Sequence, residues 1–179
     1  MTPFPLGLDS PGKRLTSTRE NRDPARLYAI IAEHHFRGFA RYARRDVTGD
    51  GQPETFCNLF AQDVAEAMSV LLPRNTRANQ IIAWLEEQAA EPSITGWEHV
   101  DEHTAQAMAD QGQLVLVGWV NPTGGPGHIA VVVPSLAGHQ FGTPESDDVW
   151  IAQAGTTNFT RGLLEQGFGS RAVSFFGHP

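Results

Sequence analysis

The sequence predicts an α+β fold, chiefly because the hydrophobic period changes along the chain. Up to about residue 112, apolar side chains recur at helical spacing. After that point come short runs rich in Val, Ile, Leu and aromatic residues, bounded by Gly, Pro and Asp. Helices therefore come first and strands follow, an order that favours an antiparallel sheet packed against the helices. The length of 179 residues suits one domain with a substantial core.

The N-terminal part begins with an arm and a first helix. Residues 1–23 are rich in Pro, Gly, Ser, Thr and Arg and predict a flexible arm, which leaves residues 24–179 as a single domain. Asp23 and Pro24 are typical of an N-cap followed by a first helical position. A helix is therefore expected from residue 24 to about residue 45.

Three more helices are expected before the strands. The first covers about residues 55–71, and one apolar stripe follows its face at four-residue intervals: Phe56, Phe60, Val64 and Met68. The others cover residues 76–90 and 101–111, and Asp101 is expected to be the N-cap of the last one. Each has apolar residues at helical spacing.

Four strands are expected after Gly112. They are QLVLVGWV at 113–120, HIAVVV at 128–133, DDVWIAQA at 147–154 and RAVSFF at 171–176. No apolar run approaches the roughly 20 residues that span a bilayer, so membrane insertion is not expected. The net charge of -7 argues against nucleic acid as the main partner.

Cys57, the only cysteine, follows a loop rich in Gly and Asp and lies in the first turn of the helix expected over 55–71. The unpaired N–H groups and the dipole of a helix start favour a thiolate. The same N–H groups, beside Asn58, suit the oxyanion of a tetrahedral intermediate. A buried cysteine acting as a small hydrophobic residue is the alternative. Because Phe56 rather than Cys57 continues the apolar stripe, the thiol is expected off the main core face.

His128 is the expected base for this nucleophile. It opens a strand directly after GGPG, a position that projects an imidazole from a sheet edge, although simple packing is the alternative. A third group should accept a hydrogen bond from the ring and fix its tautomer. Gln153, a polar residue within the next apolar strand, is the candidate, unless it faces solvent. Asn158 in the following loop is the second candidate.

With these residues in place, the chain resembles the papain-like cysteine peptidases and amidases of the CHAP and NlpC type. The resemblance lies in TFCNLFAQDVAEAM, RANQIIAW, GQLVLVGWV, GPGHIAVVV and VWIAQAG, between residues 46 and about 158. It implies a papain-like fold and cleavage of amide bonds in bacterial peptidoglycan peptides. Cys57 would be the nucleophile, His128 the base and then the acid, and Gln153 the orienting residue. Gln departs from the Glu, His, Asn or Asp more common at that position.

The resemblance also gives the loop before the cysteine two possible roles. Some CHAP domains hold calcium in such a loop, and Asp46, Asp50 and Glu54 offer oxygen ligands. A turn without an ion is the alternative, and no cofactor is otherwise required. Gln52 would contribute an oxyanion-hole amide, as a Gln upstream of the cysteine does in papain-like enzymes.

Three other functions compete with a wall hydrolase. HVDEH at 99–103 fits the H-x-x-E-H pattern of zinc peptidases, with His99 and His103 as ligands and Glu102 as base. A binding module without chemistry is a second possibility, against which the presence of both Cys57 and His128 speaks. Acyl transfer or deamidation of a protein by the same pair is the third, and it shares the nucleophile chemistry.

The expected location follows from the expected substrate. Peptidoglycan lies outside the cytoplasm, yet the first residues lack the basic and apolar stretches of a Sec signal. We therefore expect a protein that is cytoplasmic in the producing cell and reaches the periplasm or cell wall by a non-Sec route. An antibacterial effector of type VI secretion is favoured over a phage lysin. An immunity protein that covers the cleft between Cys57 and His128 is the expected partner.

Overall fold

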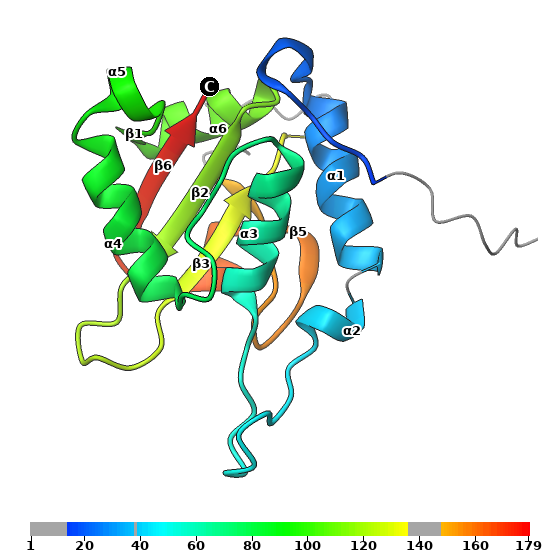
Figure 1. Ribbon diagram of the computed structural model, residues 1–179, viewed down its shortest axis with the longest axis vertical. Coiled ribbons are helices and arrows are strands. Elements are labelled where there is room, and N and C mark those ends of the chain that lie inside the picture. Colours follow the sequence, from blue (N-terminus) through cyan, green and yellow to red (C-terminus); the bar gives the residue numbers. More distant parts are fainter. Residues whose placement is uncertain (1–13, 38, 136–147) are drawn as a thin grey trace, which may run out of the picture.

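The computed structural model describes residues 14–37, 39–135 and 148–179 and has an α+β fold (Figure 1). N-terminal helices pack against a six-stranded antiparallel sheet with strand order β1-β6-β2-β3-β4-β5. The strands are β1 (Glu98–Val100), β2 (Leu114–Trp119), β3 (His128–Val132), β4 (Trp150–Gln153), β5 (Phe159–Leu163) and β6 (Ser174–His178). The predicted class and the antiparallel sheet are confirmed.

The four predicted helical segments are confirmed to within a few residues, although the first contains two helices, and the short helices Pro92–Thr95 and Leu164–Phe168 were not predicted. The helices are α1 (Pro24–Arg37), α2 (Phe39–Tyr42), α3 (Cys57–Ala67), α4 (Ala78–Ala89), α5 (Pro92–Thr95), α6 (Glu102–Asp110) and α7 (Leu164–Phe168), with a 3-10 turn η1 (Arg19–Asn21) before them. Asp101 caps α6 as predicted, since its carboxylate accepts a hydrogen bond from the N–H of Thr104 at 2.7 Å. None of the helices in the described ranges is long and apolar enough to cross a membrane.

The two strands absent from the prediction, β1 and β5, lie at the edges of the sheet. β1 has three residues, mostly exposed, and β5 reads FTRGL with only one buried residue. An edge strand covers less of the core than a central one, so its sequence need not carry an apolar pattern. The hydrophobic pattern therefore predicted the four central strands only.

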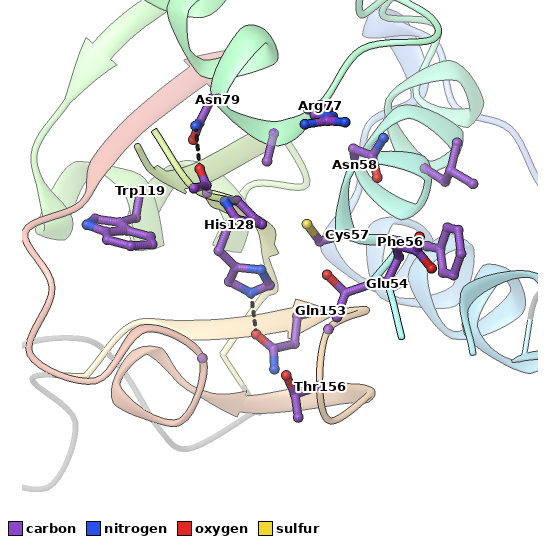
Figure 2. A pocket seen from close by; sticks show the side chains of 18 of the residues that line it. Glu54, Phe56, Cys57, Asn58, Arg77, Asn79, Trp119, His128, Gln153 and Thr156 are labelled. Atoms are coloured by element: carbon purple, nitrogen blue, oxygen red, sulfur yellow. Dashed lines mark hydrogen bonds between the residues drawn. The ribbon is translucent and has the colours of Figure 1, made fainter. Parts of the chain in front are cut away.

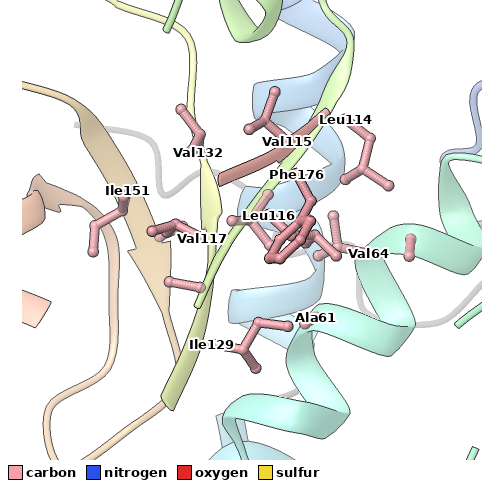
Figure 3. Packing of buried hydrophobic residues seen from close by; sticks show 14 of the residues in the cluster. Ala61, Val64, Leu114, Val115, Leu116, Val117, Ile129, Val132, Ile151 and Phe176 are labelled. Atoms are coloured by element: carbon pink, nitrogen blue, oxygen red, sulfur yellow. The ribbon is translucent and has the colours of Figure 1, made fainter. Parts of the chain in front are cut away.

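The core that supports α3 forms where this helix lies on the sheet (Figure 3). Ala61 and Val64 of α3 face Leu116, Ile129 and Phe176, and all five side chains are fully buried. α3 also packs against α1, so the helix is held on two sides. This packing fixes the start of α3 against the start of β3.

The part of the predicted arm that the structure describes is held against the domain. Ser17 is buried, its N–H donates to the carbonyl of Ala67 at 2.7 Å, and its carbonyl accepts from the hydroxyl of Ser69. Arg22 donates to the carbonyl of His178, next to the C-terminus. Residues 14–23 of the arm predicted over 1–23 therefore make specific contacts with the domain, and residues 1–13 lie outside the described residues. Ser and Arg resemble linker residues in composition, but here they pair with backbone groups of other elements.

Candidate active site

Cys57 is the first residue of α3, as predicted, but it is more buried than expected. Its side chain is only 4% exposed and belongs to the core. Backbone N–H groups of Cys57, Asn58 and Ile129 favour the thiolate, yet burial outweighs them and raises the pKa of the thiol. The thiol was expected off the main core face, whereas the structure places Cys57 in the buried core cluster at the edge of a cavity. Burial thus favours the neutral thiol over the thiolate.

His128 is the first residue of β3, and its ring contacts the residue predicted to orient it. Nε2 of His128 lies 2.6 Å from Oε1 of Gln153. The side-chain nitrogen of Gln153 donates to the carbonyl of Thr157 at 2.9 Å, which sets the amide so that its oxygen faces the ring. An amide oxygen only accepts, so Nε2 of His128 carries the proton and Nδ1 remains as the acceptor.

Gln153 is fixed by its backbone as well. The ring Nε2 of His35, on α1, lies 2.9 Å from the carbonyl oxygen of Gln153. His35 is buried and makes an edge contact with Phe60 of α3 at 4.8 Å between ring centroids. Gln153 is itself 4% exposed, so the prediction of a buried polar residue with a partner is confirmed. Gln153 is therefore hydrogen-bonded to three other parts of the fold: α1, β3 and the turn that follows β4.

The surroundings of His128 favour the neutral form of its imidazole. Burial is the main reason that the pKa of His128 lies below its ordinary value, and the positive charge of Arg171 lowers it further. The hydrogen bond to Gln153 acts in the opposite direction. Burial thus favours the uncharged form of both the thiol and the imidazole, and a proton must move when the sulfur becomes a nucleophile.

Both side chains line one cavity of about 1090 Å³, large enough for a peptide rather than a single amino acid. Figure 2 shows Cys57 at the start of α3 and His128 on the sheet on facing sides of the cavity, with Gln153 below the ring. The pKa of the thiol also responds to the N–H of Ile129, the residue after His128, so the two elements meet at this point.

Asn158, the second candidate for the orienting residue, serves the neighbouring turn instead. Its carbonyl oxygen accepts from the N–H of Gly155 at 2.9 Å, and its nitrogen donates to the carbonyl of Tyr42 at 3.2 Å. It shapes the turn that follows Gln153. Gly155 lies so close to the ring that a Cβ there would be 3.2 Å from Cε1 of His128. The geometry therefore selects Gln153.

The loop that ends at His128 is held by Asn79 of α4, a residue that the sequence analysis did not select. Asn79 accepts from the N–H of Asn121 at 3.2 Å and donates to the carbonyl of Gly125 at 3.0 Å (Figure 2). A Cβ on Gly127 would lie 1.9 Å from the side-chain oxygen of Asn79 and 2.6 Å from the carbonyl of Trp119. Gly127 is therefore required by this close approach.

The two residues predicted to bind the oxyanion both lie at the cavity, but the contacts of their side chains do not indicate that role. Asn58 and Gln52 both line it. The amide nitrogen of Asn58 donates to the carbonyl of Thr76 at 2.7 Å, so its side chain fixes the loop before α4. Gln52 is exposed, and its backbone N–H donates to Asp50. The oxyanion donors that remain near the sulfur are the backbone N–H groups of Cys57 and Asn58.

The carboxylates proposed as calcium ligands bind backbone groups of their own loop. Asp46 accepts from the N–H groups of Gly49 at 2.6 Å and Gly51 at 2.8 Å, and Glu54 accepts from the N–H of Val47 at 2.8 Å. Within the described residues no group of three or more His, Cys, Asp or Glu side chains is arranged for a metal ion. In the structure these carboxylates therefore form the pattern of a turn stabilised by aspartate, which was the alternative to calcium.

The zinc alternative lacks its helix. His99 belongs to β1 and lies 3.0 Å from Glu86, whereas Glu102 and His103 begin α6. The H-x-x-E-H pattern requires one helix to bring both histidines to one face. The break between β1 and α6 removes that geometry, and the described part of the chain holds no group of three or more His, Cys, Asp or Glu side chains arranged for a metal ion.

Comparison with known proteins gives no relative on which to transfer a role. No family model matches the chain, and no curated protein matches it in sequence.

Proposed function

We propose that the protein is a cysteine-dependent hydrolase that cleaves amide bonds in bacterial peptidoglycan peptides, with a papain-like arrangement of catalytic residues. The observation that carries the proposal is the hydrogen bond between His128 and Gln153, in a cavity that Cys57 also lines. It leaves Nδ1 of the imidazole as the only proton acceptor of the ring. A buried cysteine with a purely packing role would not explain an imidazole whose tautomer is fixed in this way.

The proposed cycle starts from the neutral pair. Nδ1 of His128 takes the thiol proton of Cys57 as the sulfur attacks the amide carbonyl, and a C–S bond forms. The backbone N–H groups at the start of α3 stabilise the oxyanion. His128 then gives the proton to the amine, the C–N bond breaks, and a thioester remains. Water, deprotonated by His128, attacks the thioester and releases the acid and the thiol.

Gln153 acts as a positioning residue in this cycle. It accepts a hydrogen bond from the ring in both protonation states, so it keeps the imidazole oriented while the proton moves. It adds no negative charge, unlike a carboxylate, so the imidazolium is stabilised less. The buried ring therefore remains a strong proton donor to the leaving amine.

The test is release of new amino and carboxyl groups from purified peptidoglycan. The expected result is cleavage by the native chain and none by Cys57→Ala or His128→Ala, each folded by circular dichroism. If the acyl-enzyme is trapped during turnover, mass spectrometry should detect one acyl group attached to Cys57. Unchanged cleavage by Cys57→Ala would end the proposal.

Delivery to the periplasm as an antibacterial effector, with an immunity protein that covers the cavity, belongs to the same proposal. The test is expression in a bacterial host with and without a fused periplasmic signal. Lysis that requires both the signal and Cys57 supports a wall substrate. Equal toxicity from the cytoplasm would favour the second candidate, a cysteine acyltransferase or deamidase of proteins, because that chemistry needs the same Cys57 and His128.

A further inference from the structure

Arg171, in the segment between α7 and β6, lines the same cavity on the His128 side. Phe168 links the two residues: its ring lies 4.9 Å from the imidazole of His128, and its carbonyl accepts a hydrogen bond from Arg171 at 2.8 Å. Phe168 is 1% exposed, so this link is rigid. The guanidinium is also near enough to His128 to influence its protonation.

The guanidinium of Arg171 is held in place before any substrate arrives. One face lies over the ring of Trp119 at 4.7 Å from its centroid, and one nitrogen is committed to the carbonyl of Phe168. Within the described residues the group has no other hydrogen-bond partner, and no carboxylate pairs with it. Its remaining N–H groups form the planar fork that binds carboxylates with two parallel hydrogen bonds.

A fixed cation beside this imidazole has a cost for the proposed reaction. His128 must become protonated when Cys57 attacks, and the charge of Arg171 opposes that step. An anion bound to the guanidinium would cancel the opposing charge. Protonation of His128 is therefore easier while an anion is bound to Arg171. If the substrate supplies that anion, its recognition is coupled to proton transfer.

We propose that Arg171 binds a carboxylate carried by the leaving-amine part of the substrate, so that the enzyme prefers amides whose released amine belongs to an amino acid or peptide with a free carboxylate there. This inference rests on the proposed function. His128 protonates the leaving amine, so that part of the substrate lies on the His128 side of Cys57. Arg171 lies on that side.

Two other arginines serve as comparisons. Arg161 is a matched control, because it also lies over a tryptophan, Trp150 at 4.2 Å, and also donates to a carbonyl, that of Pro134, yet it does not line the cavity. Arg77 does line the cavity, but at the start of α4, on the Asn58 side in Figure 2. It tests whether any cation in the cavity would serve.

The experiment measures kcat/KM on muropeptides prepared from purified peptidoglycan, with carboxylates free or converted to carboxamides with carbodiimide and ammonium. The native protein should prefer the free carboxylate by roughly tenfold to hundredfold, the range of one charge-assisted pair. Arg171→Gln should bring this ratio close to one. Arg161→Gln and Arg77→Gln should keep it. Part of the loss should be in kcat, because the carboxylate also favours protonation of His128.

The outcomes are distinguishable. Equal cleavage of both substrates by the native protein overturns the role of Arg171 and leaves the proposed function intact. Loss of the preference in Arg77→Gln but not in Arg171→Gln overturns it as well. No cleavage of either substrate removes the proposed function and this inference together. If Arg171→Gln unfolds, Arg171→Lys, which keeps the charge but not the fork, should lower the ratio, and an unchanged ratio contradicts the proposal.

Discussion

The cavity has two sides that are built in different ways. On the sheet side, the groups around the imidazole are held by other elements: Gln153 by His35 of α1 and by Thr157, and the loop before His128 by Asn79 of α4. On the loop side, residues 44–54 bind mainly one another, through Asp46, Asp50, Glu54 and the bridge between Arg45 and Glu54. The sheet side is preorganised by tertiary contacts, whereas the loop side is organised locally.

The largest effect is expected when the same substitution is made on each side. Gly127→Ala puts a methyl group against Asn79 and the carbonyl of Trp119, so the backbone before His128 must shift, and cleavage of peptidoglycan should fall about a hundredfold. Gly51→Ala, on the loop side, meets no atom within 4 Å and suffers only the strain of its positive φ of 79°. Its activity should stay within about threefold. Equal losses of cleavage activity in Gly127→Ala and Gly51→Ala would contradict the claim that only the sheet side is preorganised.

A smaller loss is expected from the residue that orients the ring. Gln153→Ala should lower kcat by roughly tenfold to a hundredfold, less than Cys57→Ala or His128→Ala, because it removes only the acceptor of the Nε2 hydrogen bond. Gln153→Glu should keep most of the activity and move the acid limb of the pH profile upward, since a carboxylate raises the pKa of His128.

Asn158→Ala is the comparison for the orienting role. It removes the contacts to Gly155 and Tyr42 and should reduce turnover less than Gln153→Ala. A damaging Asn158→Ala beside a neutral Gln153→Ala would transfer the orienting role to Asn158.

The protonation of the thiol gives a prediction that needs no substrate. Burial raises the pKa of Cys57, so alkylation by iodoacetamide should be slow at neutral pH and reach half its maximal rate above the value of about 8.5 usual for a free thiol. The chain unfolded in urea is the control and should react with the ordinary profile. Cys57 is the only cysteine, so the mass of the whole protein reports on it alone. A half-maximal rate below that of the unfolded chain would mean that the helix start outweighs burial.

The smallest effect is expected at the aspartate that shapes the loop. Asp46→Ala removes the acceptor of two backbone N–H groups, and peptidoglycan cleavage should change by less than about twofold, since both hydrogen bonds lie within the loop. Calcium should not raise the melting temperature of the native chain, and a chelator should not lower its activity. If calcium raises the melting temperature of the native chain and Asp46→Ala abolishes this rise, the loop binds calcium.

The sequence by itself determined the elements with strong local signals. The period of apolar residues predicted α3 and the central strands, and the capping residue predicted the start of α6, because these signals depend on neighbours only two to four positions away. It also placed Cys57 at a helix start and His128 at a strand start, and it selected Gln153 as a buried polar residue. Edge strands β1 and β5 carried too weak a pattern to be predicted.

The tertiary structure decided what these residues can do. His35 and Gln153 are 118 positions apart, and Asn79 and Gly125 are 46 apart, so no local pattern marks them as partners. The pKa of Cys57 depends on the core packed around α3, which outweighs the helix start that the sequence emphasised. No local pattern in the sequence marks Arg171 as a site residue. The fold places its guanidinium over Trp119 and connects it through Phe168 to His128. Burial and long-range contacts are properties of the packed chain, and they set the chemistry of this site.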